Sequence, residues 1–368
     1  MMSEASHHLW HKSKGFPKMR VRTILITVLF SLFTVSTLAT AQGRSDKLEA
    51  GSMAPGLNVE TWVKGSFNAA SAEVYVVEFW ATWCGPCKLS IPHLTELLEE
   101  YELDGLQIVG ISTDSETEKV APFVRKQGLK MNYTVGIDNR RRTSRAWMKA
   151  AGLEGIPSAF IVDKNGIIQW IGNPLDEEFE TTLAKVMSGR YDVKKMKEVR
   201  ESKSAAKHFR SLNSWDDARN AYENAIAIGP IVFADQYIEL FKMLLIDKRD
   251  EAAAYELATK IITERGSEDP ELLTWLAKEI ASNEEITGSA RRMDVAMNAA
   301  RTAQTFAKRK NDPKYISAIA FVHYYDDKID EAIEWQRKAY FSAREKKKEP
   351  FKFTLDSYRI QKQLAEEG

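Results

Sequence analysis

A change in the pattern of apolar residues near position 190 divides the chain into two parts. Between Gly51 and Gly189, short runs rich in β-branched and aromatic residues alternate with stretches that have helical spacing. From Lys194 onward the strand-like runs stop, and apolar residues recur every three or four positions among charged ones. Because 368 residues also exceed the usual size of one core, we predict an α/β domain over 51–190 and an all-helical domain over 195–368.

The order of elements in the α/β part indicates a mixed sheet. Strands are expected at 73–80, 106–112, 133–137, 159–162 and 167–171, with helices at 91–101, 116–127 and 143–150. The last two strands flank Asp163-Lys164-Asn165-Gly166, and an Asn-Gly pair between apolar runs is a strong hairpin signal. Alternation that ends in a hairpin predicts a sheet with both parallel and antiparallel strands, flanked by helices.

Small residues recur along the helical part and suggest repeated helix pairs. Ala218 and Ala252 are separated by 34 residues, the period of tetratricopeptide repeats (TPR), in which small residues let paired helices approach closely. Most of the large consensus positions of that repeat are missing, and later alanine pairs follow a different spacing. A TPR-like array and a generic helical array therefore both remain open, and we expect a scaffold without chemistry of its own.

The balance of positive and negative residues disfavours nucleic acid as a partner. Lys plus Arg and Asp plus Glu number 52 each, so no global field draws the chain onto nucleic acid. Hydrophobic residues make up 44% of the chain, which is enough apolar material to build folded cores. We therefore expect a folded protein without a nucleic-acid partner.

An uncharged apolar run near the N-terminus predicts export. Residues 23–39 carry no charge, two arginines precede them, and Ala39-Thr40-Ala41 offers a small-x-small cleavage site. We predict a signal peptide over 1–41, with Met19 as an alternative start of translation, and a linker over 42–50. A run of this length lies at the lower end of the about 17 to 25 residues that cross a bilayer, so a retained anchor is the alternative. Either outcome implies a periplasmic or other extracytoplasmic location.

The chain has two cysteines, and they form one Cys-x-x-Cys motif. Cys84 and Cys87 follow directly after the expected strand at 73–80 and lie at the mouth of a helix. Unpaired N–H groups and the helix dipole lower the pKa of the first thiol below its free value of about 8.5. A Cys84 thiolate can attack a disulfide, and Cys87 can then close a Cys84–Cys87 disulfide and release the product.

A structural metal site is the alternative use of such a pair. Zinc would need two further ligands, and no second cysteine pair exists in the chain. His93, His208 and His323 do not have the spacing of paired histidine ligands. We therefore expect no metal and no cofactor.

The motif and its surroundings resemble the thioredoxin superfamily over about residues 51–189. The resemblance rests on Phe-Trp-Ala-Thr-Trp-Cys-Gly-Pro-Cys-Lys at 79–88, Ala54-Pro55, Pro92 and Gly155-Ile156-Pro157-Ser158. Within the superfamily the segment looks like the exported TlpA/ResA-like disulfide reductases. This resemblance implies a thioredoxin-like fold and an enzyme that exchanges thiols and disulfides.

The resemblance also implies roles for individual residues. Pro157 is expected to be cis and to face the cysteine pair, and Ile156 is expected to offer backbone hydrogen bonds to an extended substrate. The surface between and beside the cysteines, made by Trp83, Gly85 and Pro86, is expected to form the rest of the substrate groove.

Glu78 is a further candidate for the catalytic set. It lies on the expected strand at 73–80, where the family often holds a buried carboxylate beneath the cysteines, and its neighbours Val76, Val77 and Phe79 favour an interior strand. Burial would raise the pKa of this carboxyl and let it take the proton of Cys87.

The direction of the reaction is predicted from the residues between the cysteines. A Gly-Pro pair resembles thioredoxin, whose potential of about −270 mV makes it a reductant. The resemblance then implies protein disulfides as clients and a membrane protein of the thiol-transferring type as electron donor. The alternatives are a disulfide oxidase or isomerase, or an adaptor whose helical part binds a protein partner.

Overall fold

The computed structural model describes residues 47–309 and 311–367, and these belong to one compact unit. The predicted signal peptide at 1–41, the alternative start at Met19 and most of the predicted linker lie outside the described residues. Within the described ranges, no helix has the length and apolar character needed to cross a membrane.

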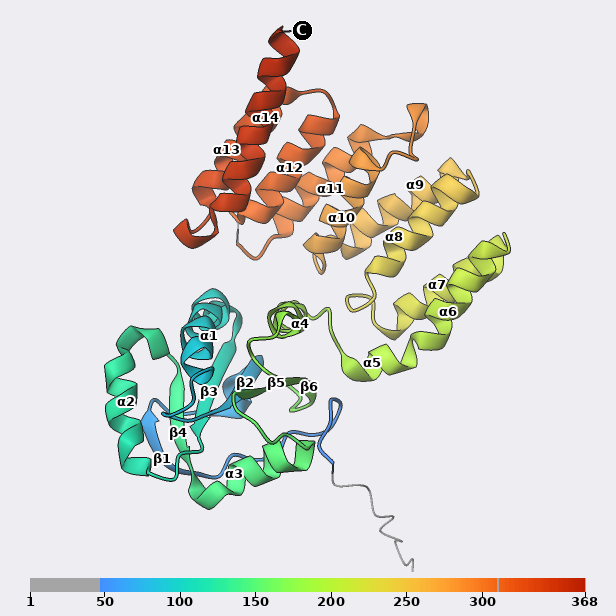
Figure 1. The fold of residues 1–368 in the computed structure, drawn as a ribbon. Coiled ribbons are helices and arrows are strands. Elements are labelled where there is room, and N and C mark those ends of the chain that lie inside the picture. Colours follow the sequence, from blue (N-terminus) through green and yellow to red (C-terminus); the bar gives the residue numbers. More distant parts are fainter. Residues whose placement is uncertain (1–46, 310, 368) are drawn as a thin grey trace, which may run out of the picture. The chain divides into compact units, whose positions relative to one another are not determined.

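The described residues of the first part form one six-stranded mixed sheet with the order β1-β4-β3-β2-β5-β6 (Figure 1). The strands are β1 Val59–Lys64, β2 Val74–Trp80, β3 Leu106–Ser112, β4 Thr134–Asp138, β5 Ser158–Asp163 and β6 Ile168–Gly172. The central strands β2, β3 and β4 are parallel, whereas β1, β5 and β6 add antiparallel pairings. The predicted mixed sheet is therefore confirmed, and β1 is an edge strand that the sequence patterns had not indicated.

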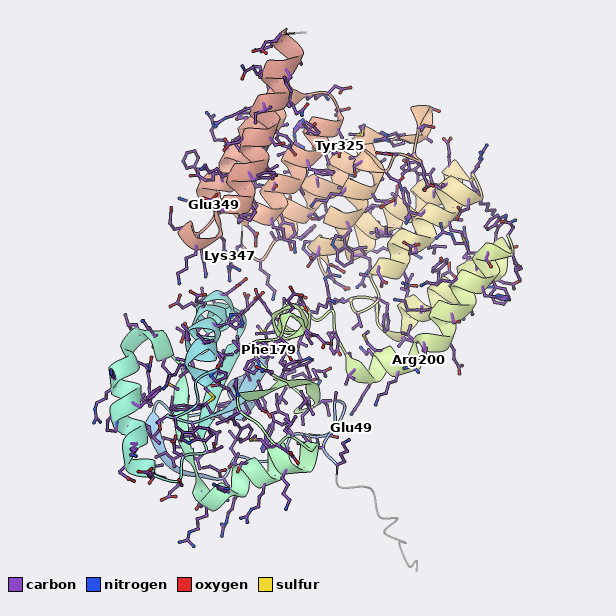
Figure 2. The ribbon with its side chains drawn as sticks, viewed as in Figure 1. Glu49, Phe179, Arg200, Tyr325, Lys347 and Glu349 are labelled. Atoms are coloured by element: carbon purple, nitrogen blue, oxygen red, sulfur yellow. A yellow bond between two sulfur atoms is a disulfide. The ribbon has the colours of Figure 1, made fainter. Side chains whose placement is uncertain are left out.

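Helices cover the sheet and connect its strands. They are α1 Cys87–Tyr101, α2 Val120–Gln127, the short α3 Arg142–Ser144 and α4 Glu177–Met187. A π-helical turn over Arg145–Lys149 continues α3, so the helix expected at 143–150 is irregular. The helix α4 was not predicted. Its residue Phe179 is labelled in Figure 2. Phe179 is fully buried and packs against Trp170 of β6.

Strand β2 lies at the centre of two apolar layers. All seven of its residues are buried, and successive side chains point to opposite faces of the sheet. Val76 and Trp80 belong to the cluster on the α1 side, whereas Val77 and Phe79 belong to the cluster on the other side. Glu78 alternates with Val77 and Phe79, so its carboxyl group lies on the α1 side of the sheet.

The second part consists of helices, as predicted. They are α5 Val193–Glu198, α6 Arg200–Ser211, α7 Trp215–Ile228, α8 Asp235–Lys242, α9 Glu251–Lys260, α10 Pro270–Ser282, α11 Met293–Phe306, α12 Pro313–Tyr325, α13 Ile329–Ser342 and α14 Glu349–Glu367. Helix α6 packs on α7, α10 on α11, and α12 on α13 (Figure 1). The alanines Ala218, Ala225, Ala296 and Ala303 are fully buried, whereas Ala252, the expected equivalent of Ala218 at the 34-residue period, is exposed. The TPR-like array therefore stays a prediction.

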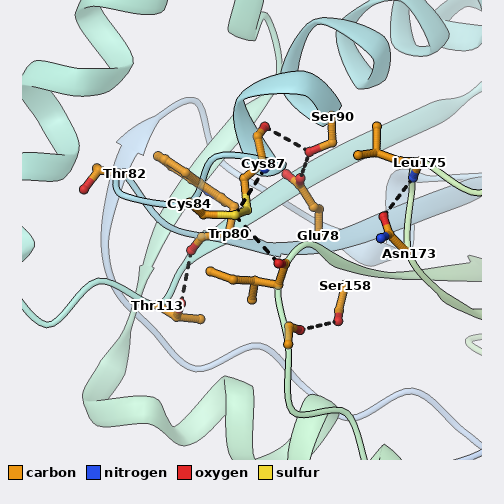
Figure 3. The surroundings of a disulfide bond; sticks show 12 residues. Glu78, Trp80, Thr82, Cys84, Cys87, Ser90, Thr113, Ser158, Asn173 and Leu175 are labelled. Carbon is orange, nitrogen blue, oxygen red and sulfur yellow. Dashed lines mark hydrogen bonds between the residues drawn. A yellow bond between two sulfur atoms is a disulfide. The ribbon is translucent and has the colours of Figure 1, made fainter.

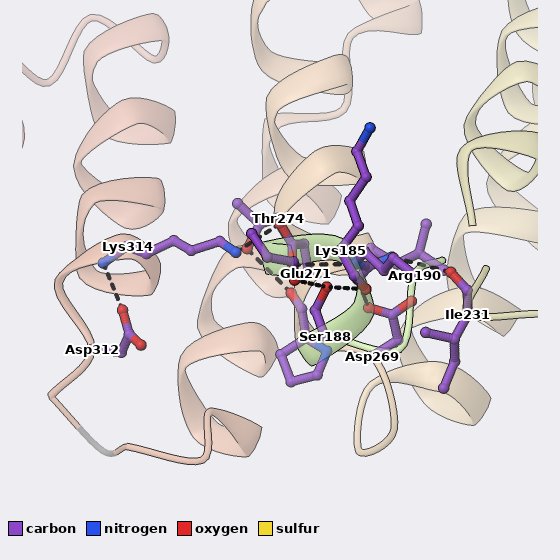
Figure 4. A network of polar contacts seen from close by, with 12 residues as sticks. Lys185, Ser188, Arg190, Ile231, Asp269, Glu271, Thr274, Asp312 and Lys314 are labelled. Carbon is purple, nitrogen blue, oxygen red and sulfur yellow. Dashed lines mark hydrogen bonds and ion pairs between the residues drawn. The ribbon is translucent and has the colours of Figure 1, made fainter. Parts of the chain in front are cut away.

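A buried ionic network holds the connection between α4 and α5 (Figure 4). The guanidinium group of Arg190 contacts the carboxylates of Asp269 and Glu271, and Lys314 contacts Glu271 at 2.7 Å. Arg190 also lies over the ring of Trp275, with 4.5 Å to the ring centroid. The Arg190 side chain is only 10% exposed and that of Asp269 only 2% exposed. Removal of either residue would therefore leave the other as an uncompensated buried charge.

Candidate active site

The cysteine pair lies where β2 leads into α1 (Figure 3). Cys84 and Cys87 are joined by a disulfide, and their side chains are almost fully buried. The backbone N–H of Cys87, the first residue of α1, donates to Cys84 Sγ at 3.1 Å. A thiolate on Cys84 would therefore be stabilised by this donor and by the positive end of the helix dipole.

A buried carboxylate holds the turn that precedes Cys84. Asp114 accepts hydrogen bonds from the backbone N–H of Thr82 at 3.0 Å and from the Thr82 hydroxyl at 2.7 Å. Ser112 Oγ donates to the same carboxylate at 2.8 Å. Sequence reasoning missed Asp114, although it follows the predicted strand at 106–112. The carboxyl ends of neighbouring parallel strands meet at one edge of a sheet, and that rule was the available signal.

The surface beside the disulfide is apolar and exposed. The Trp83 side chain is 70% exposed, and Gly85 and Pro86 are exposed as well. Leu89, in the first turn of α1, is also exposed. A hydrophobic surface at a reactive sulfur suits contact with an unfolded or extended polypeptide.

The loop before β5 approaches the disulfide from the other side. The Ile156–Pro157 peptide bond is cis, and the Ile156 carbonyl oxygen lies 3.7 Å from Cys84 Sγ. Ser158 Oγ donates to the Gly155 carbonyl oxygen at 2.7 Å and closes the turn. Ile156 is half-buried, whereas Pro157 is buried. The structure thus brings together Cys84 and the Ile156–Pro157 loop, which are far apart in the sequence.

Glu78 is fully buried beneath the first turn of α1 (Figure 3). Burial raises the pKa of its carboxyl to about 7, while hydrogen bonds with Ser90 and Tyr133 lower it. The distances are 2.7 Å from Ser90 Oγ to Oε1 and 3.2 Å from the Tyr133 hydroxyl to Oε2. The carboxyl group can therefore both hold and release a proton near neutral pH.

Ser90 and Tyr133 are site residues that sequence reasoning missed. Ser90 lies three positions after Cys87 on α1, so helical spacing was a signal for its proximity. Tyr133 precedes β4, which is separated from β2 by β3, and no local pattern relates it to Glu78.

Among the described residues, no group of three or more His, Cys, Asp or Glu side chains is arranged to hold a metal ion.

Comparison with known proteins finds similarities to the α/β part. Residues 50–171 match the model of the AhpC/TSA family. The chain is 26% identical over 174 residues to thiol-disulfide oxidoreductase ResA of Bacillus thuringiensis (strain Al Hakam), covering 46% of this chain and 96% of the relative. It is 27% identical over 156 residues to protein FixW of Rhizobium leguminosarum, covering 40% of this chain and 70% of the relative.

A solved structure is similar to part of the chain. It is described as a putative thiol:disulfide interchange protein DsbE from Chlorobium tepidum, with 26% identity and a TM-score of 0.33. The match covers 38% of this chain and 99% of that chain. The α/β part therefore has ResA-like relatives, and the thioredoxin-like resemblance predicted from the sequence is confirmed for it.

Proposed function

We propose that the protein is a thiol-disulfide oxidoreductase that reduces disulfides of client proteins through Cys84 and Cys87. The observation that carries this proposal is the Cys84–Cys87 disulfide at the start of α1, beside the Ile156–Pro157 loop and above buried Glu78. The ResA-like relatives support the same chemistry, because their names describe thiol-disulfide oxidoreductases.

The reaction proceeds in two exchanges. The Cys84 thiolate attacks one sulfur of the client disulfide, the client S–S bond breaks, and the other client sulfur leaves as a thiolate. Cys87 then gives its proton to Glu78 and attacks Cys84 Sγ. The Cys84–Cys87 bond forms, the bond from Cys84 to the client breaks, and the client leaves with its second thiolate. Two electrons pass from the enzyme dithiol to the client disulfide.

The groove around Cys84 holds the client during these steps. Trp83, Gly85 and Pro86 form one wall, and their exposure makes them available to an extended client segment. Ile156 and Pro157 form the other wall, where the backbone near Ile156 pairs with the client. This assignment of groove residues follows the resemblance to the thioredoxin superfamily.

The organisation of the chain follows the same proposal. The enzyme domain spans 51–190 and the helical, TPR-like domain spans 195–368, after a signal peptide at 1–41 that directs the protein to the periplasm or a similar space. The oxidised enzyme must be recharged there, so a membrane protein of the thiol-transferring type serves as electron donor. The helical domain recruits a protein partner.

The first experiment is the reduction potential of the Cys84–Cys87 pair, by equilibration against dithiothreitol buffers. We expect a value near the about −270 mV of thioredoxin, together with reduction of insulin disulfides by the dithiol form. A Cys84→Ser variant should have no activity, whereas Cys87→Ser should accumulate a mixed disulfide with the client. A potential above about −180 mV would assign the protein to the oxidases and isomerases instead.

A further inference from the structure

The Glu78 carboxyl has two hydroxyl partners that come from different elements. Ser90 is in the first turn of α1, and Tyr133 directly precedes β4. Glu78 and Ser90 are fully buried, and Tyr133 is 3% exposed. These hydroxyl groups are the hydrogen-bond partners that the described residues give to the carboxyl, one at each oxygen.

The Ser90 hydroxyl also contacts the second cysteine. Its Oγ lies 3.0 Å from the Cys87 carbonyl oxygen and 2.7 Å from Glu78 Oε1 (Figure 3). Because a hydroxyl has one hydrogen, Ser90 cannot donate to both oxygens at once. When Glu78 is ionised, its carboxylate is the stronger acceptor and takes that hydrogen. When Glu78 is protonated, its O–H can donate to Ser90 Oγ, and the Ser90 hydroxyl can then donate to the Cys87 carbonyl oxygen.

Tyr133 can contact Glu78 because the residue of β3 that lies between them is a glycine and has no side chain. Glu78 is paired with Gly110 in the register of β2 and β3. A Cβ atom added at Gly110 would lie 2.9 Å from Tyr133 Cε2 and 3.0 Å from Trp80 Nε1. A larger residue at this position would therefore displace the Tyr133 ring from its contact with Glu78. The position of the Tyr133 ring therefore depends on the glycine at position 110.

We propose that Ser90 and Tyr133 are positioning residues of the exchange reaction, which stabilise the Glu78 carboxylate so that it can take the proton of Cys87. The inference rests on the proposed function and adds two residues to it. When the proton moves from Cys87 Sγ to Glu78, the Ser90 hydrogen is free to turn from the carboxyl to the Cys87 carbonyl oxygen. The Cys87 thiolate then attacks Cys84 Sγ, the Cys84–Cys87 bond forms, the disulfide bond between Cys84 and the client breaks, and the client leaves as a thiolate.

The acid-base balance of the site supports this assignment. Burial raises the pKa of Glu78, and the hydrogen bonds with Ser90 and Tyr133 act against that rise. Removal of either hydroxyl should therefore raise the pKa further. Glu78 would then remain protonated at neutral pH and would be a poor acceptor for the Cys87 proton.

The test follows the two exchanges separately. The reduced full-length protein, as wild type, Ser90→Ala or Tyr133→Phe, is mixed with 5,5′-dithiobis(2-nitrobenzoate), and release of thionitrobenzoate is recorded from about pH 5 to 9. The first release reports attack by Cys84, and the second reports attack by Cys87. Matched controls are Ser188→Ala and Tyr101→Phe, because Ser188 Oγ donates only to backbone carbonyls of α4 and Tyr101 is not hydrogen-bonded to Glu78.

We expect the midpoint of the second release to move up by about one pH unit in Ser90→Ala and in Tyr133→Phe, which slows it roughly fivefold at pH 7. The first release should keep its wild-type pH profile, and both controls should behave as wild type. If a variant folds poorly, a ¹³C NMR titration of the Glu78 carboxyl in the remaining folded protein should show the same upward shift.

Two results separate the inference from the function on which it rests. Wild-type midpoints in Ser90→Ala and Tyr133→Phe, or equal slowing of both releases, would show that the hydroxyls have no role through Glu78. If the wild-type dithiol itself failed to reduce the probe, the proposed function would be wrong and the hydroxyl network would have no exchange reaction to serve.

Discussion

Glu78 combines a charged group with complete burial, and this combination has a cost for folding. Its side chain is 0% exposed, and its pKa is raised to about 7 in the folded protein, mainly by burial. In the unfolded chain the pKa returns to its ordinary value near 4.5. Between these two values the folded state binds a proton that the unfolded state does not. The stabilising contribution of protonated Glu78 is therefore fully present below about pH 4.5 and is lost as the pH rises through about 7.

Glu78→Gln should consequently stabilise the protein at alkaline pH. The substitution removes the cost of a buried charge, which corresponds to at most about 3 kcal/mol at pH 8. Urea unfolding at several pH values is expected to show that the fall in stability between about pH 4.5 and 7 is smaller in the variant. The matched control is Glu73→Gln, because the Glu73 carboxylate is exposed. If the free energy of unfolding fell with pH as steeply in Glu78→Gln as in the wild type, the raised pKa of Glu78 would be contradicted.

At the scale of elements, the site depends on how β2, β3 and α1 meet. Asp114, which follows β3, accepts hydrogen bonds from Thr82 in the turn after β2. The Tyr133 hydroxyl, which comes from the far side of β3, donates to the Glu78 carboxyl beneath α1. Strand β3 therefore contributes a carboxylate at its end and an empty position at Gly110 in its middle. Neither contribution is a reactive group, and both determine where the reactive groups lie.

Asp114→Asn should loosen the turn that carries Cys84. An amide can still accept one hydrogen bond, but the charge-assisted bonds from Thr82 and Ser112 are lost. We expect a loss of about 1 to 3 kcal/mol in the free energy of unfolding, measured by chemical denaturation of the oxidised protein. Asp176→Asn is the control, since Asp176 is exposed and makes no side-chain capping bond at the start of α4. Equal effects of the two substitutions would rule out this role of Asp114.

Gly110→Ala should disturb the site without touching a cysteine. The added methyl group would overlap with the rings of Tyr133 and Trp80, both of which are buried. Overpacking of this kind costs about 1 to 3 kcal/mol. Thermal unfolding measures the cost, and the second release of thionitrobenzoate should shift as it does in Tyr133→Phe. The control Gly56→Ala has open space around the new methyl group and lies outside the site. Wild-type stability in Gly110→Ala would show that the Tyr133 and Trp80 rings can move aside without loss of folding free energy.

At the scale of the whole molecule, Arg190 fixes the segment that leads from the sheet into the helices. Its guanidinium group contacts Asp269, which is the N-cap of α10 and accepts from the backbone N–H of Leu272. The same carboxylate therefore serves a helix terminus and an ion pair. Exposed pairs, such as Lys164 with Glu73, lack this double role.

Arg190→Ala should be strongly destabilising because it leaves a buried carboxylate without its partner. Removal of one member of a buried pair typically costs about 3 to 5 kcal/mol, whereas an exposed pair contributes about 0 to 1 kcal/mol. Denaturant unfolding of Arg190→Ala and of the control Lys164→Ala compares the two cases. Similar losses in both variants would show that the network around Asp269 is not a determinant of stability.

Local patterns in the sequence were enough to predict the sheet, the helical second part and the cysteine chemistry. A strand that runs directly into Cys84-Gly85-Pro86-Cys87, with a helix behind it, is recognised from neighbouring residues alone. The hairpin of β5 and β6 is likewise encoded in its Asn-Gly turn. These features depend on spacing and turn chemistry, which act over a few residues.

Tertiary structure decided which polar groups surround the site. Tyr133 contacts Glu78 only because β4, β3 and β2 lie side by side and because β3 has a glycine between them. Asp114 supports the turn before Cys84 only because parallel strands end at the same edge. Helix α4 was missed although its local pattern is helical, with Phe179, Leu183 and Val186 at helical spacing and acidic residues in the first turn. Edge strand β1 escaped prediction because it pairs with β4, which is distant in the sequence. Contacts between such distant residues follow from strand order, and strand order is not written in any local pattern.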